Sequence, residues 1–395
     1  MKRFFSYIIL SFFLLLLPTR QASANNNDSI RLSLLTCAPG EEIYSLFGHT
    51  AIRYENPSQG IDVVFNYGLF SFNTPNFIFR FSLGETDYQL GATDYERFAA
   101  EYAFFGRSVW QQTLNLTDEE KTELIRLLQE NYRPENRVYR YNFFYDNCAT
   151  RPRDKIEESI AGKVIYPAEP QDGSLTFRDI VHQYCKGHPW ARFGIDLCIG
   201  SEADQPITQR QMMFAPFYLM DAFDGAQIKS DSIQRPLITT NELVVDATPE
   251  PDESGWMPTP LQCTLLLFIL TTAATIYGIR RRTGLWGIDL FLFGIAGIVG
   301  CVLAFLALFS QHPAVSSNFL LLVFHPGQLL FLPYIIYCVR KGKKCWYLTL
   351  NLAVLTLFIV LFPVIPQRFD FAVVPLALVL LIRSASNLIV TSKKK

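Results

Sequence analysis

The sequence predicts an α+β exported domain followed by an all-α transmembrane domain of five helices. Three observations lead to this fold class. The first 24 residues have the pattern of a signal peptide, residues 25–245 mix strand-like with helix-like runs, and residues 261–395 are dominated by apolar stretches. A chain of 395 residues that is 50% hydrophobic is long enough for both parts.

The amino-terminal segment has the three parts of a signal peptide. Lys2 and Arg3 precede the apolar run 7–17, and Ala22-Ser23-Ala24 forms a small-residue cleavage site. An uncleaved first membrane span is the alternative interpretation. In either case, the chain after Ala24 is exported.

Residues 25–245 alternate between the two hydrophobic periods. The runs "TAIRYE" and "IDVVFNYG" alternate like strands, whereas "LTDEEKTELIRLLQENY" has the helical period. In that helix Thr117 is the expected N-cap and Glu120 closes a capping box. The run "DKIEESIAG" predicts a shorter helix that ends at Gly162. Residues 246–260 are rich in proline and acidic residues and predict a linker, with Trp256 at the membrane interface.

Five apolar stretches follow the linker, and each is near the ~20 residues that cross a bilayer as a helix. They are residues 261–279, 286–309, 319–339, 345–365 and 371–390.

The connections between these stretches alternate in charge. Basic runs at 280–282, 340–344 and 393–395 fall on one side, and the connections on the other side carry little net charge. The positive-inside rule then gives a cytoplasmic C-terminus and an external soluble domain. We therefore expect a multi-pass protein of the inner (cytoplasmic) membrane with a periplasmic domain.

The net charge of −1 conceals two parts of opposite sign. Residues 25–260 contain 34 acidic and 20 basic residues, and residues 261–395 contain 2 acidic and 12 basic residues. An acidic soluble part argues against nucleic acid as a partner.

Four of the 8 cysteines belong to the exported domain, namely Cys37, Cys148, Cys185 and Cys198. An oxidising compartment allows disulfides, so a local Cys185–Cys198 pair and a Cys37–Cys148 pair both stay open. The cysteines at 263, 301, 338 and 345 are expected to be apolar filler in or beside spans.

Cys148 has the surroundings of a nucleophile. Asn147 is a good N-cap, so the thiol would lie at a helix start, where free N–H groups favour an anion. Arg151 and Arg153 add positive potential. Pro152 conflicts with this arrangement, because a proline at that depth kinks the helix or delays its start.

A cysteine nucleophile needs a base, and His49 is the preferred histidine. It follows Gly48 at the start of the strand-like run, whereas His182 is expected on a solvated helix face and His188 on the surface. A structural role for His49 alone stays open. A third polar group usually orients such an imidazole. If the strand-like runs pair antiparallel, Asn66 is the first choice for that group and Asp62 the second.

The motifs "GHTAIRY", "NYGLF" and "YDNCATRPRD" together resemble the Lnb family of lipoprotein N-acyltransferases. The similarity extends to "SVWQQTLNLTDEEK" and "QHPAVSSN". The resemblance implies a permuted papain-like fold of the NlpC/LRAT type, in which the histidine strand precedes the cysteine helix. The order of His49 and Cys148 matches this arrangement.

The resemblance also implies a reaction without a cofactor. The Cys148 thiolate, deprotonated by His49, would take an acyl chain from a phospholipid as a thioester. The α-amine of a diacylglyceryl-cysteine lipoprotein would then accept the chain. Asn66 would complete the catalytic set.

Four further residues are expected to bind substrate, namely Arg53, Arg151, His312 and His325. His312 lies in the connection on the outer side, where it can meet a lipid headgroup. His325 precedes Pro326 and Gly327 inside the third stretch. A buried polar ring at that depth indicates a cavity or a polar contact, and a simple kink with a backbone partner is the equal alternative.

Two other functions fit part of the sequence. An NlpC-type peptidase or amidase of the cell envelope would use the same Cys–His chemistry, and one span would suffice to anchor it. A non-catalytic envelope sensor would hold Cys148 in a disulfide. A metal site is not expected, because no Cys or His cluster has ligand spacing.

Overall fold

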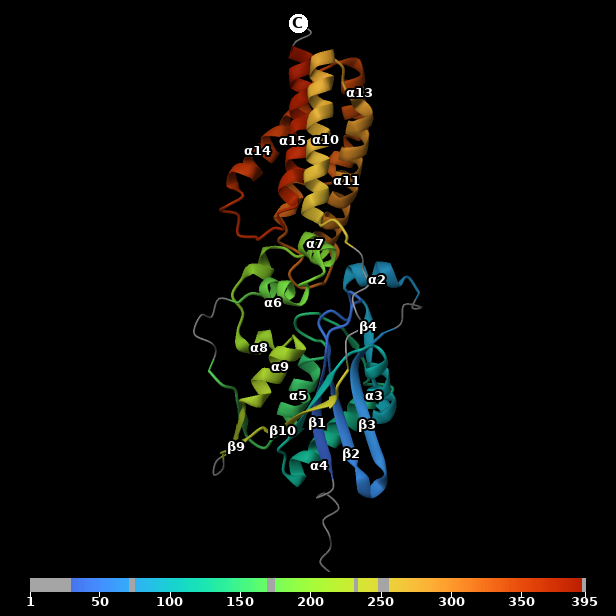
Figure 1. Ribbon diagram of the computed structural model, residues 1–395, viewed down its shortest axis with the longest axis vertical. Helices are drawn as coiled ribbons and strands as arrows, with labels where there is room; N and C mark the ends of the chain where they lie inside the picture. Colours follow the sequence, from blue (N-terminus) through green and yellow to red (C-terminus); the bar gives the residue numbers. More distant parts are fainter. Residues whose placement is uncertain (1–29, 71–74, 169–174, 231–233, 248–255, 393–395) are drawn as a thin grey trace, which may run out of the picture.

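A computed structural model describes residues 30–70, 75–168, 175–230, 234–247 and 256–392. A sheet-rich part and a helical bundle occupy opposite ends of the elongated molecule (Figure 1). The expected signal peptide and most of the expected linker lie outside the described residues. The α+β class expected for the first part is confirmed.

A seven-stranded antiparallel sheet in the order β10-β5-β1-β2-β3-β4-β6 forms the centre of the exported part. Its strands are β1 (Arg31–Cys37), β2 (His49–Asn56), β3 (Ile61–Leu69), β4 (Asp87–Asp94), β5 (Val109–Leu114), β6 (Val138–Arg140) and β10 (Ile238–Val245). The predicted antiparallel pairing of the two strand-like runs is confirmed, with Ala51 opposite Asn66. A smaller sheet contains β7 (Lys163–Ile165), β8 (Gln227–Lys229) and β9 (Gln234–Pro236).

Helices cover both faces of the central strands, which explains why β1 and β2 are buried almost throughout. The helices of this part are α2 (Phe77–Leu83), α3 (Tyr95–Phe104), α4 (Asp118–Tyr132) and α5 (Thr150–Ser159). One core joins Leu34 and Ile52 to Leu124 and Ile156, from α4 and α5. The other joins neighbouring strand residues to Phe98 of α3. The two cores form because successive strand residues point to opposite faces.

The predicted capping box of the longest exported helix is present. Thr117 accepts from the N–H of Glu120, and the Glu120 carboxylate accepts from the N–H of Thr117. Glu120 is itself buried, with Arg235 as its ion-pair partner. Helix α4 therefore packs against the sheet at β4, and α5 packs against α4.

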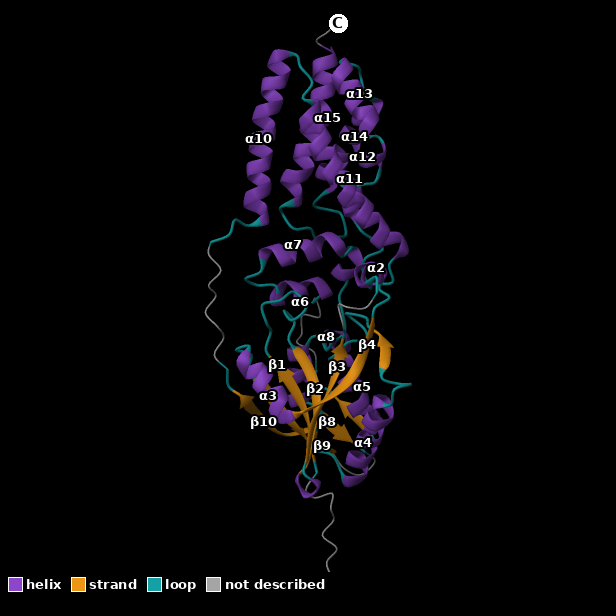
Figure 2. Ribbon diagram, turned by 90° about the vertical axis from the view of Figure 1, so that its right-hand side faces the viewer, coloured by secondary structure: helices purple, strands orange, loops and turns teal. Residues whose placement is uncertain are grey.

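A small helical layer lies between the sheet and the bundle (Figure 2). It contains α6 (Phe177–Tyr184), α7 (Pro189–Cys198) and η3 (Ser201–Asp204). The next two helices, α8 (Gln209–Met212) and α9 (Pro216–Asp224), lie beside the sheet, where α9 packs on β1 and β10. Arg178 of α6 is fully buried and pairs with Asp196 at 2.6 Å and Asp204 at 2.8 Å. These two ion pairs hold α6, α7 and η3 together.

The bundle contains α10 (Pro260–Arg281), α11 (Trp286–Phe309), η4 (Phe319–Leu322), α12 (Gly327–Leu330), α13 (Leu332–Lys341), α14 (Trp346–Leu361) and α15 (Val373–Ser392). Among the described residues, α10, α11 and α15 are each long and apolar enough to cross a membrane. The third expected stretch is broken, with a bend of 74° between 319–330 and 332–341. The fourth forms a helix of 16 residues that ends before Pro363. Five continuous spans are therefore not seen, because prolines interrupt two of the stretches.

The helical layer and the bundle are joined by backbone hydrogen bonds. The N–H of Gly200 donates to the carbonyl of Ala314 at 2.6 Å, and that of Ser201 donates to Ser317 at 2.9 Å. A Cβ at Gly200 would lie 2.4 Å from the Ser317 carbonyl oxygen, so only glycine allows this approach. Arg368, in the connection before α15, pairs with Asp179 and Asp204. These contacts tie α6 and η3 to the bundle.

The bundle contains a buried ion pair that the sequence analysis did not anticipate. Arg383 of α15 donates to Asp289 of α11 at 2.7 Å and to the Thr275 hydroxyl of α10 at 2.9 Å. Both charged side chains are 2% exposed. A charge inside a bilayer needs such a partner, and this pair ties three helices together.

Candidate active site

Cys148 lies in the turn that leads into α5, two residues before the helix begins. The Asn147 side-chain oxygen accepts from the N–H groups of Ala149 at 2.8 Å and Thr150 at 3.0 Å. Its amide nitrogen donates to the carbonyls of Phe143 and Phe214. Asn147 therefore caps the turn that leads into α5 and ties it to the neighbouring loops, although the N-cap position of α5 itself is Ala149, not Asn147 as predicted.

The helix begins at Thr150, with Ala149 in the N-cap position, which is later than a cap at Asn147 predicts, so the later start that Pro152 indicated is found. The first helical hydrogen bonds run from Arg151 to the Asn147 carbonyl and from Arg153 to the Ala149 carbonyl, both at 3.2 Å. The helix continues through Pro152 without a break. Only the Cys148 carbonyl loses its i+4 donor, because proline has no N–H.

His49 and Asn66 lie together on neighbouring strands. The Nε2 atom of His49 is 3.2 Å from the side-chain oxygen of Asn66. Because that oxygen only accepts, Nε2 carries the proton and Nδ1 keeps its lone pair. This tautomer is the one that a general base needs.

The Cys148 sulfur lies beside the start of β2. The backbone N–H of Thr50, the residue after His49, faces the sulfur. On the other side, a Cβ at Gly68 would lie 3.6 Å from the Cys148 Cβ, in ordinary contact. The register of β3 against β4 shifts between Asn66 and Leu69, next to this point. The structure thus brings Cys148 to the strand ends that carry His49 and Asn66.

As whole residues, Cys148 and His49 are partly exposed, but their ionisable atoms lie inside the fold, where burial governs their titration.

The electrostatics differ from the prediction of an activated thiolate. Burial raises the pKa of the Cys148 thiol to about 11, although the N–H groups of Thr50 and of Cys148 itself lower it. Burial also lowers the pKa of His49 to about 4, against the opposing hydrogen bond with Asn66. The empty site at neutral pH therefore holds a neutral thiol and a neutral imidazole.

The expected help from neighbouring arginines is absent because both are paired. Arg151 forms two hydrogen bonds with Asp146, at 2.6 and 2.8 Å, and its guanidinium lies 3.5 Å from the centre of the Tyr139 ring. Arg153 pairs with Asp154. The paired carboxylates therefore offset the positive potential that the two guanidiniums would exert at the Cys148 sulfur.

All eight cysteines are free thiols in the structure, so neither open disulfide is formed. Cys37 lies opposite His49 in the sheet, and burial raises its pKa to about 12. Cys185 is buried and Cys198 is partly buried. A disulfide does not compete for Cys148 in this state.

Arg53, expected to bind substrate, is committed to other contacts. It forms two hydrogen bonds with Asp62 at 2.8 and 2.7 Å, donates to Gln111 at 2.7 Å, and stacks on Tyr95. Its partner Asp62 is therefore occupied, which leaves Asn66 as the residue that contacts His49. These contacts hold the sheet together below the site.

The two membrane-side histidines also have partners. His312 Nε2 is 2.6 Å from the carbonyl oxygen of Phe81, and burial lowers the pKa of His312. His325 Nε2 is 3.3 Å from the Asn351 side-chain oxygen, and Asn351 donates to Ser384 at 3.0 Å. The partner of His325 is thus a side chain of α14, not a backbone carbonyl.

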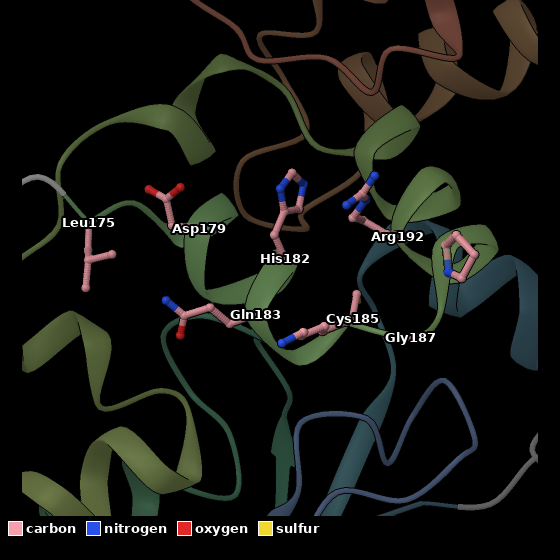
Figure 3. Close-up of a pocket in the computed structure, with 9 residues that line it drawn as sticks. Leu175, Asp179, His182, Gln183, Cys185, Gly187 and Arg192 are labelled. Atoms are coloured by element: carbon pink, nitrogen blue, oxygen red, sulfur yellow. The ribbon is translucent and has the colours of Figure 1, made fainter. Parts of the chain in front are cut away.

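A cavity of about 440 Å³ lies between α6 and α7, and neither Cys148 nor His49 lines it. Figure 3 shows His182 rising from α6 beside Arg192 of α7. His182 Nε2 is 2.9 Å from both carboxylate oxygens of Asp196. His182 therefore has a buried partner, which the sequence did not indicate. Within the described ranges, no group of three or more His, Cys, Asp or Glu side chains is placed to hold a metal ion.

Sequence reasoning missed the groups around the sulfur that are not motif residues. The Thr50 N–H, Gly68 and the rings of Tyr88 and Tyr141 all lie near Cys148. The glycine of the "YG" pair at the end of β3 was a usable signal, since Gly68 has φ +91°. The sequence held no such signal for Tyr88 and Tyr141, because only the folding of the chain brings them close to Cys148.

Fold and site together define a membrane protein with a periplasmic α+β domain and an apolar helical bundle, in which Cys148 lies beside the start of the strand that carries His49. Residues 19–182 match the family model of the Lnb N-terminal periplasmic domain, and residues 252–395 match that of the Lnb transmembrane domain. The chain belongs to the Lnb family. No curated protein and no solved structure shows a significant match to it.

Proposed function

We propose that this protein is a lipoprotein N-acyltransferase that carries an acyl chain from a phospholipid to a lipoprotein amine through a thioester on Cys148. One observation carries the proposal. The Cys148 sulfur lies against the N–H of Thr50, the residue after His49. The Nε2 atom of His49 is itself held by Asn66. This proximity supports assigning Cys148 as the nucleophile, His49 as the base and Asn66 as the orienting group.

The first half-reaction begins from the neutral pair. As the sulfur attacks the ester carbonyl carbon, Nδ1 of His49 takes the thiol proton. The bond between the carbonyl carbon and the glycerol oxygen then breaks, and His49 returns the proton to that oxygen. A lysophospholipid leaves and a thioester remains on Cys148.

The second half-reaction uses the same groups in reverse. The neutral α-amine of a diacylglyceryl-cysteine attacks the thioester carbonyl, and His49 accepts a proton from the amine. The carbon–sulfur bond breaks and the sulfur regains its proton from His49. The product is an amide, and the lipoprotein is triacylated.

Both tetrahedral intermediates carry a negative oxygen that needs donors. The N–H of Cys148 lies in the capped turn just before α5, beside its own sulfur. Asn147 already satisfies the N–H groups of Ala149 and Thr150. The Cys148 N–H is therefore the best placed donor for the oxyanion.

The fixed junction between the helical layer and the bundle supports a lipid substrate. The bundle places the exported part at one membrane face, and hydrogen bonds such as that from Gly200 to Ala314 hold it there. A peptidase of the envelope needs only a tether, so this rigid attachment favours a substrate that resides in the bilayer.

A labelling experiment tests the proposal. The full-length protein in detergent is incubated with a phospholipid that carries a radiolabelled acyl chain, and label on the protein is measured. We expect hydroxylamine-sensitive label on the wild type and none on Cys148→Ser or His49→Ala. Cys198→Ser is the matched control and should retain the label, since Cys198 lies on α7.

The second step is measured with a synthetic diacylglyceryl-cysteine peptide. We expect label to pass from the protein to the peptide amine. Cleavage of envelope peptide bonds without any lipid label on Cys148 would instead establish the amidase. Normal transfer by Cys148→Ser would refute both enzyme assignments.

A further inference from the structure

Helix α2 is an apolar helix that lies outside the protein core. It has the sequence FIFRFSL and no buried residue. Ile78 is 81% exposed and Phe79 is 58% exposed. Its one charge, Arg80, is held by Asp87 at 2.8 Å and by the Glu85 carbonyl. An exposed apolar cluster of this kind needs a partner that covers it.

The same helix lies against the end of a membrane span. The ring of Phe79 is 6.0 Å from the ring of Phe305 in α11. The N–H of Gln311, just after α11, donates to the Leu83 carbonyl at 2.8 Å, and His312 contacts the Phe81 carbonyl. Figure 2 shows α2 level with the helical layer below the bundle. The exposed face of α2 is therefore continuous with the apolar surface of a span.

A series of aromatic rings leads from α2 toward the thiol. Phe81 stacks on Phe77 at 6.0 Å, Phe77 on Phe70 at 5.9 Å, Phe70 packs on Tyr88 at 5.0 Å, and Tyr88 stacks on Tyr141 at 4.2 Å. We call these five rings the aromatic ladder.

The ladder ends at Cys148. Phe70 and Tyr141 pack in the same apolar cluster as Cys148. Tyr88 and Tyr141 lie near enough for the thiol charge to affect their own titration. The rings thus form an unbroken series of apolar contacts between the span surface and the nucleophile.

The chemistry of this surface favours lipid over protein as its occupant. It is continuous with α11, and α2 presents no free charge that would fix a polar partner. Apolar and aromatic side chains at a helix beside a span are typical of insertion at the bilayer interface.

We propose that α2 is inserted among the acyl chains of the outer leaflet and that the aromatic ladder guides one chain to Cys148. This inference rests on the proposed acyltransferase function, since it names the entry route for the phospholipid donor. It assigns to α2 and to Phe77 a substrate-binding role.

Photocrosslinking tests the insertion. Benzoylphenylalanine is placed at position 78, and at position 165 as control, in the full-length protein in vesicles of phosphatidylethanolamine and phosphatidylglycerol. Ile165 is also exposed, on the small sheet at the end away from the bundle (Figure 1). We expect a phospholipid adduct by mass spectrometry at position 78 and none at 165. Equal or absent adducts at the two positions would overturn the insertion.

The route is tested by the rate of Cys148 acylation from labelled phospholipid. Phe77→Ser removes a central ring of the ladder, and we expect a rate at least about tenfold lower, since a large apolar contact is lost. Ile165→Ser should stay within about twofold of the wild type. An unchanged rate for Phe77→Ser, with the fold intact by thermal unfolding, would refute the route.

The two proposals fail in different ways. If the variant with benzoylphenylalanine at position 78 crosslinks to lipid but the wild type never acquires label on Cys148, the reaction is wrong and the insertion of α2 stands. If Cys148 is labelled and position 78 yields no lipid adduct, the reaction stands and the route through α2 is wrong.

Discussion

Replacing Asn66 by alanine tests how the imidazole is oriented. The substitution removes the acceptor that lies 3.2 Å from His49 Nε2. The Nε2–H then lacks its partner in a position where Asn66 is only 7% exposed. Leaving a buried donor unsatisfied costs about 1–3 kcal/mol. If this cost falls on the catalytic geometry, acyl transfer slows by roughly 5- to 150-fold.

The assay is the transfer of labelled acyl chains to Cys148 and onward to the peptide amine, with thermal unfolding measured in parallel. Asn56→Ala is the matched control, because Asn56 is also buried, at the opposite end of β2. It should lower stability without a comparable loss of rate. Asn66→Ala with a rate within about twofold of the wild type would refute the orienting role.

Asn66→Asp separates orientation from charge. The carboxylate still accepts from Nε2, and its negative charge raises the pKa of His49 from about 4. The base is then lost to protonation at a higher pH. We expect the acid limb of the pH–rate profile to move upward, while the rate near pH 8 stays closer to the wild type than that of Asn66→Ala.

Three further outcomes follow from the geometry. Because burial raises the pKa of Cys148 to about 11, its alkylation by iodoacetamide, measured as the difference from Cys148→Ser, should keep rising up to pH 10 without a plateau near 7. Asp289→Leu leaves Arg383 buried without its counter-charge and should cost about 3–5 kcal/mol of stability, whereas the double variant with Arg383→Leu should recover most of the thermal midpoint. Gly48→Ala should destabilise the fold by more than about 1 kcal/mol, because Gly48 has φ +77° and the new Cβ would lie 2.5 Å from the Cys37 carbonyl oxygen; unchanged unfolding would contradict this.

Much of the scaffold could be predicted because its signals are local. The Thr117–Glu120 capping box, the capped turn at Asn147 and the strand alternation after His49 depend on residues close together in the chain. The pairing that brings Asn66 to His49 joins two consecutive strands, so the sequence also indicated it.

The parts that could not be predicted depend on distant contacts. The thiol pKa was expected to be lowered, but the sequence did not show that Asp146 would occupy Arg151 or how deeply Cys148 would be buried. The number of charges in the spans was visible, yet the pairing of Asp289 with Arg383 joins residues 94 positions apart. Charge pairing and burial are properties of the assembled fold.

The bond between Gly200 and Ala314 has a consequence for which acceptors the protein can serve. It joins main chain to main chain, so rotation of a side chain cannot break it, and it ties the exported part to the membrane bundle at close range. Under the proposed acyl transfer, such a junction favours an amine that its own fatty chains hold at the membrane surface. A free peptide of the periplasm would reach the same site less often.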